Sequence, residues 1–254
     1  TANLKNVSVT GYVSGTALSV GETGVLNAEN VALYMDPSVS TSYWALSNLG
    51  TASFKDSVFV NAGVIKNEGD LIFKNSTLKA TGSFTNSGNL AFENSSLSDG
   101  KTIKNSAGAE LGLDGVRITN FENNEPESDV YNGVVLKNDG VVRINNSEIN
   151  AGTTSDVKYD KAVYGGVLYN AGEMSINKTV FTNNALNVGA VSIFGGVIYN
   201  SGDQTITDSI FTGNILEGTY GQYGFLYNTN GKMTISGSVF SNNKSDASTG
   251  STST

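Results

Sequence analysis

The sequence contains no cysteine and no histidine, and only two prolines and one tryptophan among its 254 residues. It therefore cannot form a disulfide, a Cys or His metal site, or a nucleophile activated by an imidazole. The absence of cysteine is typical of a protein that crosses or occupies an oxidising compartment and avoids thiol chemistry. We expect no cofactor and no catalytic metal.

Basic side chains and long apolar runs are also scarce. The chain has 15 Lys and Arg against 23 Asp and Glu, which gives a net charge of −8. Nucleic-acid binding is not expected, because it requires a surface that neutralises phosphates. No apolar run is long enough to predict a membrane-spanning helix. No signal peptide begins the chain, so we expect a mature chain or a fragment.

Turn-forming residues are abundant instead. Thirty glycines accompany many Asn, Ser and Thr, while hydrophobic residues make up 38% of the chain. This composition favours an all-β fold with many tight turns and enough apolar side chains for a core.

A repeat runs through most of the chain, and its anchor is an Asn followed two or three residues later by Gly. The residue two positions before the Asn is apolar each time, which predicts a strand with one buried face. The first three intervals between anchors are 19 residues, and the later ones are 28 to 33. The anchors are Asn48, Asn67, Asn86, Asn105, Asn138, Asn170, Asn200 and Asn228.

Each unit continues with a second alternating apolar pair, a second turn and a third apolar position. Such a unit is too short for a propeller blade and contains no helix, but it fits one rung of a solenoid. We predict a single right-handed parallel β-helix of about ten rungs over residues 1–243, followed by a flexible Ser/Thr-rich tail at 244–254. Asn and Gly are expected at the corners because they tolerate positive φ, and stacked Asn side chains are expected to form a ladder.

The longer units carry their extra residues at one place, after the third strand. These insertions fall near residues 119–131, 151–164, 185–194 and 215–223. Insertions at one corner of stacked rungs emerge on one side, so we predict a lateral ridge in the C-terminal half. Such ridges often mark the binding face of a solenoid.

Aromatic residues gather around these insertions. The alternation places Tyr169, Tyr199 and Tyr227 on the outside, one rung apart, which predicts an aromatic platform for a sugar or a partner protein. Cross-rung stacking that only stabilises an exposed strand is the alternative. The candidate binding residues are Tyr131, Tyr159, Tyr164, Tyr169, Phe194, Tyr199, Tyr220, Tyr223 and Tyr227.

Carboxylates are scattered among the turns, and this pattern favours surface turns over a catalytic pair. One acidic cluster comprises Glu122, Glu125, Glu127 and Asp129 and suggests a solvated loop. A Ca²⁺ site there, or around Asp156 and Asp160, is an open alternative. We predict no catalytic residues and no enzymatic activity. A polysaccharide lyase or glycoside hydrolase on a β-helix is the alternative.

The paired motifs Gly165–Leu168 (GGVL) and Gly195–Ile198 (GGVI), followed by Phe181–Asn184 and Phe211–Asn214 (FxxN), resemble the GGA[ILV] and FxxN repeats of the chlamydial polymorphic outer-membrane proteins. The third residue is Val here, whereas that family has mostly Ala. The resemblance covers about the last 90 residues.

This resemblance implies the β-helical passenger of an autotransporter, exposed on the outer membrane of a Gram-negative bacterium or secreted. It implies adhesion to a host surface protein or glycan, and membrane association only through a barrel domain outside this chain. A structural stalk or filament subunit that self-associates through its rung ends is a further alternative.

Overall fold

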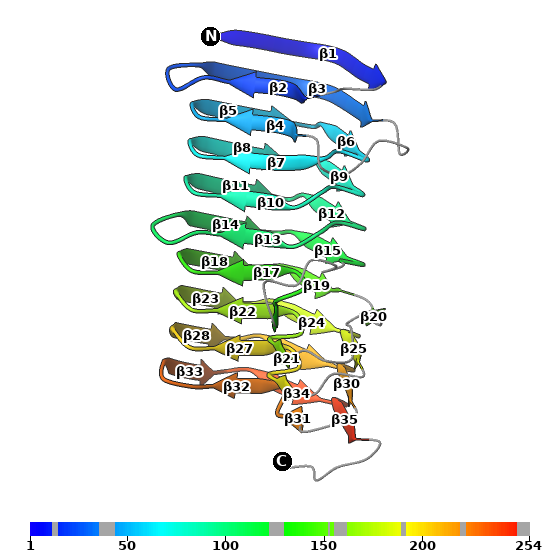
Figure 1. Cartoon of the computed structure of the whole chain (residues 1–254), viewed down its shortest axis with the longest axis vertical. Coiled ribbons are helices and arrows are strands. Elements are labelled where there is room, and N and C mark those ends of the chain that lie inside the picture. Colours follow the sequence, from blue (N-terminus) through cyan, green and yellow to red (C-terminus); the bar gives the residue numbers. More distant parts are fainter. Residues whose placement is uncertain are drawn as a thin grey trace.

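The computed structural model describes residues 1–11, 15–35, 44–121, 130–151, 153–154, 162–188, 192–218 and 222–247. These residues form a rod of stacked rungs, with the N-terminus at one end and the last described strand at the other (Figure 1). Every pairing between strands is parallel and joins one rung to the next, as in Ile65↔Phe84 and Phe84↔Ile103. The parallel β-helix predicted from the repeat is confirmed.

Two large sheets form the body of the rod. In each rung the chain turns after the anchor Asn, at what we call the first corner, and then enters the long sheet. The long sheet has 18 strands. Its strands are β1 (Ala2–Gly11), β3 (Val25–Met35), β5 (Thr51–Lys55), β6 (Val58–Val60), β8 (Asp70–Lys74), β9 (Thr77–Lys79), β11 (Asn89–Glu93), β12 (Ser96–Ser98), β14 (Glu110–Asp114), β15 (Arg117–Thr119), β18 (Val141–Asn145), β19 (Glu148–Asn150), β23 (Glu173–Asn177), β24 (Val180–Thr182), β28 (Asp203–Thr207), β29 (Ile210–Thr212), β33 (Lys232–Ser236) and β34 (Val239–Ser241).

The return sheet has nine strands, which lie across the core from the long sheet and end at the anchor Asn. They are β2 (Thr16–Val20), β4 (Trp44–Asn48), β7 (Val64–Asn67), β10 (Phe84–Asn86), β13 (Ile103–Asn105), β17 (Leu136–Asn138), β22 (Leu168–Asn170), β27 (Ile198–Asn200) and β32 (Leu226–Asn228). The first described rung contains only β1, and each later rung contains one of these nine strands. The described residues therefore form ten rungs, as the repeat predicted.

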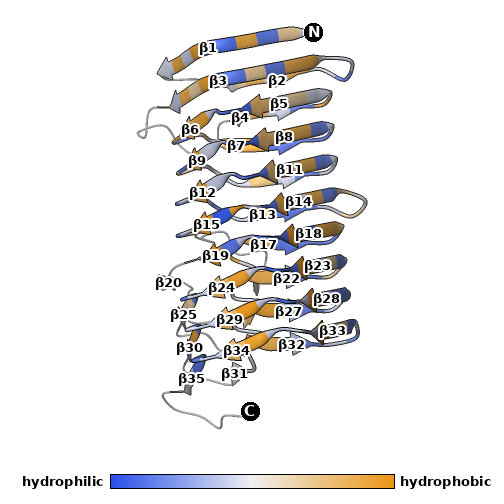
Figure 2. Ribbon diagram, turned by 180° about the vertical axis from the view of Figure 1, so that it is seen from behind, coloured by the Kyte–Doolittle hydropathy of each residue, from blue (hydrophilic) through white to orange (hydrophobic). Residues whose placement is uncertain are grey.

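Alternating apolar side chains fill the space between the two sheets, and Figure 2 shows this alternation along the strands. Phe54, Phe73 and Phe92 are fully buried and stack with ring centroids 5.2 Å apart. Phe181 and Phe211 continue the pattern in the C-terminal half, with centroids 4.6 Å apart. Identical residues therefore pack on each other from rung to rung.

A ladder of asparagines, buried except for Asn228, runs along the first corner. Each Nδ2 donates to the Oδ1 of the next anchor. The first bond of the ladder, Asn48–Asn67, is 2.7 Å long, and the last, Asn200–Asn228, is 2.6 Å long. The predicted ladder is confirmed. The glycines beside this ladder mostly serve another purpose than we predicted, because only Gly108 among them has positive φ. A Cβ on Gly69 would lie 2.1 Å from the carbonyl oxygen of Gly50, so close rung stacking requires glycine there.

The second corner, which is the turn between the two successive strands of the long sheet in one rung, does require positive φ. Asn75 and Asn94 have φ of 49° and 46°. The following serine organises this corner, because the Ser76 hydroxyl donates to the Lys74 carbonyl oxygen and accepts from the Ser57 amide of the preceding rung.

The insertions of the longer rungs, which we predicted as a lateral ridge, contribute two additional parallel sheets. They lie on one side of the C-terminal half of the rod (Figure 1), and together we call them the flange. The first flange sheet comprises β20 (Thr153–Thr154), β25 (Ala185–Val188), β30 (Ile215–Gly218) and β35 (Lys244–Ala247), and the second comprises β16 (Val130–Asn132), β21 (Ala162–Tyr164), β26 (Ile193–Phe194) and β31 (Gln222–Tyr223).

The flange has a small apolar core of its own. It is made by Val163, Leu186, Ile193 and Leu216, with Phe225 packed against it. Strand β35 pairs with β30, so the solenoid extends four residues into the segment predicted to be a flexible tail. Residues 248–254 lie outside the described residues.

Candidate functional site

Paired glycines build the junction where the flange returns to the body of the rod. Gly195 has φ of +70°, and a Cβ there would lie 2.1 Å from the Ile198 carbonyl oxygen. At Gly196, the next residue, a Cβ would lie 2.9 Å from the Leu216 side chain. The first glycine therefore makes the turn, and the second leaves room for a leucine of the first flange sheet.

The Phe-x-x-Asn motifs build the other junction, where the flange leaves the body of the rod. Asn184 donates through Nδ2 to Asn214 Oδ1 at 2.8 Å, and Asn214 donates in the same way to Asn243 at 2.8 Å. This is a second asparagine ladder, beside the stacked rings of Phe181 and Phe211. Both motif types that suggested a family resemblance thus have a structural role at the base of the flange.

The flange places two aromatic stacks against each other. Tyr164, Phe194 and Tyr223 stack on the second flange sheet, with neighbouring centroids 5.0 and 4.6 Å apart. On the adjoining return sheet, Tyr169, Tyr199 and Tyr227 stack at 5.2 and 5.7 Å. We call these six residues the aromatic notch.

Edge-to-face contacts join the two stacks across the corner. The Tyr164 and Tyr199 centroids are 5.0 Å apart at 84°, and those of Phe194 and Tyr227 are 5.3 Å apart at 66°. Outward side chains from two adjoining sheets can meet in this way only where the outer surface is concave. Aromatic contacts contribute about 0.5–1.5 kcal/mol each, so the notch also holds the flange against the rod.

The notch is apolar but edged with hydroxyl groups. Burial raises the pKa of the Tyr199 phenol, and the neighbouring Tyr169, Tyr164 and Tyr227 raise it further. The ring is therefore uncharged at neutral pH. The central rings, Phe194 and Tyr199, have neighbours on both faces, so they offer edges to a ligand. Tyr223 is more open, with 39% of its surface exposed.

The structure thus brings together six of the nine sequence-predicted binding residues. Tyr131 lies in β16, where it pairs with Val163, one position away from the Tyr164 row. Tyr159 and Tyr220 lie outside the described residues.

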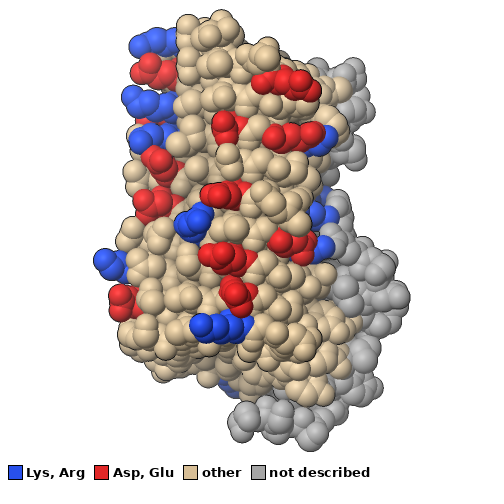
Figure 3. All heavy atoms as spheres, turned by 90° about the vertical axis from the view of Figure 1, so that its left-hand side faces the viewer, with Lys and Arg blue, Asp and Glu red and all other residues tan. Residues whose placement is uncertain are grey.

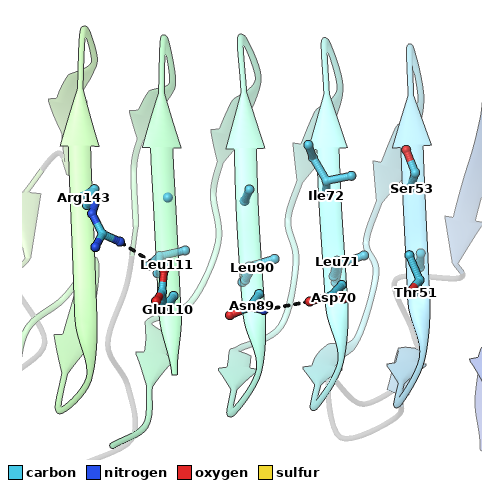
Figure 4. Close-up of a pocket in the computed structure, with 13 residues that line it drawn as sticks. Thr51, Ser53, Asp70, Leu71, Ile72, Asn89, Leu90, Glu110, Leu111 and Arg143 are labelled. Carbon is cyan, nitrogen blue, oxygen red and sulfur yellow. Dashed lines mark hydrogen bonds and ion pairs between the residues drawn. The ribbon is translucent and has the colours of Figure 1, made fainter. Parts of the chain in front are cut away.

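A second concave surface was missed by the sequence reasoning. A hollow of about 350 Å³ lies on the long sheet across β5, β8, β11, β14 and β18 (Figure 4). We call it the lateral groove. Its outward row consists of Ser53, Ile72, Ala91, Gly112 and Arg143, and the bordering row of Thr51, Asp70, Asn89 and Glu110. The available signal was the small residue that lies between the two buried residues of a strand in three of these rungs, namely Ser53, Ala91 and Gly112.

The carboxylates of the lateral groove are held by neighbouring rungs. Asn89 Nδ2 donates to Asp70 Oδ1 at 2.7 Å, and Arg143 pairs with Glu110 at 3.1 Å. The two acids lie two rungs apart, roughly 9–10 Å along the rod. A glycosidase acid must stay protonated through burial or a like charge. Glu110 instead is exposed and forms an ion pair with Arg143, so it has neither burial nor a neighbouring like charge.

Other carboxylates accept hydrogen bonds at the second corner. Asp56 accepts a hydrogen bond from Asn75, and Asp114 accepts one from Asn146. Within the described residues, no three Asp or Glu side chains are grouped so that they could hold a metal ion. The candidate Ca²⁺ ligands Glu122, Glu125, Glu127, Asp129, Asp156 and Asp160 lie outside the described residues. Figure 3 shows acidic and basic side chains interspersed on one face.

Within the part of the chain that the structure describes, no helix is long and apolar enough to cross a membrane. No family model matches the sequence, and no curated protein matches it.

Proposed function

We propose that the chain is the β-helical passenger of an autotransporter-like protein, exposed on the outer membrane of a Gram-negative bacterium or secreted. In this proposal it acts as an adhesin that binds a host surface protein or glycan and catalyses no reaction. The observation that carries the proposal is the aromatic notch, a cluster of six stacked rings at the place where the flange meets the body of the rod.

Three features support binding at the notch. Tyrosine is enriched in the energetically dominant parts of protein interfaces, because its ring is large and rigid and its hydroxyl is polar. The notch combines such rings with the phenol hydroxyls of Tyr199 and its neighbours. The flange is also a regular structure with its own core, so the notch is held in place before a ligand arrives, which lowers the entropy cost of binding.

Two other functions remain candidates. A polysaccharide-active enzyme is favoured by the concave lateral groove with two carboxylates, and is opposed by the Arg143 partner of Glu110. A stalk or filament is favoured by the exposed apolar side chains of Ile235, Val239 and Phe240 on the last level, where another rung can stack. Assays on acidic polysaccharides and size measurements against concentration separate these candidates from an adhesin.

Removal of the flange tests the proposal. The short connection Asn61–Gly63 (Asn-Ala-Gly) links the long sheet to the return sheet in a rung without a flange. We expect a chain with this tripeptide in place of residues 120–134, 151–166, 183–196 and 213–224 to keep the β-sheet circular dichroism spectrum and to lose binding to host cells or matrix. Unchanged binding by the folded variant would show that the flange is not the binding face.

A further inference from the structure

The lateral groove contains a glycine that the fold does not require. Gly112 lies at the centre of β14 and has no positive φ. A Cβ added to it would meet only the Ala91 Cβ, at 3.9 Å, which is an ordinary contact. Glycine inside a strand weakens it, and it often marks a place where another molecule approaches closely. At this position the backbone is left uncovered on the outer face of the sheet.

We propose that the lateral groove binds a neutral, linear oligosaccharide that lies along the rod axis. This site is separate from the aromatic notch, and the inference does not rest on the proposed function. The groove crosses five successive strands of the long sheet, from β5 to β18, so its length is roughly 19 Å at about 4.8 Å per rung. This length suits a chain of several sugar units.

The lining matches the chemistry of a sugar chain. Ile72, Ala91 and the uncovered backbone at Gly112 form an apolar floor for the C–H faces of sugar rings. The bordering row offers acceptors at Asp70 and Glu110 and both donors and acceptors at Thr51 and Asn89. Ligand sites commonly combine an apolar floor with a few polar groups that orient the ligand. The polar row repeats at the rung spacing, so successive sugars can meet similar partners.

Other occupants fit the groove less well. A peptide strand cannot extend the sheet here, because β8, β11 and β14 are already paired on both sides and peptide addition requires a free sheet edge. A polyanion would meet Asp70 and Glu110, while the one cation, Arg143, already pairs with Glu110. The net charge of −8 also disfavours an anionic ligand. An uncharged chain rich in hydroxyl groups avoids both costs.

Two tyrosine substitutions on the same outward row test the proposal. Gly112→Tyr fills the groove, whereas Thr205→Tyr adds the same side chain beyond it, because Gly112, Arg143, Ser175 and Thr205 succeed each other in register. Both positions face outward on the long sheet, where tyrosine is favoured. The probes are neutral linear oligosaccharides of hexose or N-acetylhexosamine, their uronic acid counterparts and an unstructured peptide, titrated by calorimetry.

We expect a neutral oligosaccharide to bind the native chain, Gly112→Tyr to weaken binding by about tenfold or more, equivalent to roughly 1.4 kcal/mol, and Thr205→Tyr to leave it unchanged. Equal loss in both variants, no binding of any neutral oligosaccharide, or preference for uronic acids or the peptide would overturn the proposal. Cleavage of the bound oligosaccharide would support the groove as the binding site, but it would contradict the proposal that the chain catalyses no reaction. Circular dichroism checks the fold of both variants.

Discussion

Replacement of Asn138 by alanine is expected to lower the free energy of unfolding by roughly 3–5 kcal/mol, because it leaves several buried polar groups unpaired at about 1–3 kcal/mol each. Asn138 is fully buried. Its Nδ2 donates to Asn170 Oδ1 and to the carbonyl oxygens of Gly140 and Glu173. Its Oδ1 accepts from Asn105 Nδ2 and from the Gly140 amide.

The matched control is Asn27→Ala. Asn27 also bonds to an Asn one level away, Asn3, but this pair is exposed to water. Water replaces the lost bond there, so we expect a change within about 0.5 kcal/mol. Urea unfolding followed by circular dichroism measures both variants. Similar effects at the two positions would mean that the buried ladder adds nothing beyond an exposed pair.

Gly202→Ala is expected to lower the free energy of unfolding by about 3 kcal/mol, at the upper end of the usual range for overpacking. A Cβ on Gly202 would lie 2.0 Å from the Gly172 carbonyl oxygen and 2.7 Å from the backbone of Ala171. Both neighbours are backbone atoms of the preceding rung. They cannot rotate away as a side chain would, so the two rungs must separate at the first corner.

The same substitution at Gly112 provides the comparison and should act in the opposite direction. Gly112→Ala removes the conformational freedom of glycine from a strand without a clash, so we expect a gain of about 0.4–1 kcal/mol. Thermal unfolding of the two variants gives the signs directly. A harmless Gly202→Ala variant would contradict the close rung contact that we assign to the glycines beside the Asn ladder.

The fold was accessible from the sequence because each residue packs on its counterpart one rung away. Phe54, Phe73 and Phe92 recur every 19 residues and stack in space, so the periodicity reports tertiary contacts directly. The Asn ladder followed from the same reasoning. What the periodicity could not distinguish was why each glycine is present. Glycine at the second corner supplies positive φ, as at Gly115, whereas Gly69 is required by lack of space.

The flange was predicted only as a ridge. Its strands are short, as in Ile193–Phe194, so no alternation reveals them within one rung. Their stability comes from pairing across levels, as in Leu186↔Leu216. The sequence predicted the stack of Tyr169, Tyr199 and Tyr227. The second stack was not predicted, because it forms only when the strands of the second flange sheet pair across rungs. The lateral groove was missed because outward side chains such as Ser53 and Ala91 follow no apolar pattern.

Host-cell binding by the native chain and by Tyr199→Ser tests the central claim most directly. Tyr199 contacts three other rings of the aromatic notch, namely Tyr164, Tyr169 and Tyr227. Tyr34→Ser is the control, because Tyr34 is 44% exposed on the N-terminal part of the rod. We predict that Tyr199→Ser weakens binding by about tenfold or more, as expected for a dominant interface residue, and that Tyr34→Ser does not. Equal binding by all three folded proteins would contradict the assignment of the notch as the adhesive surface.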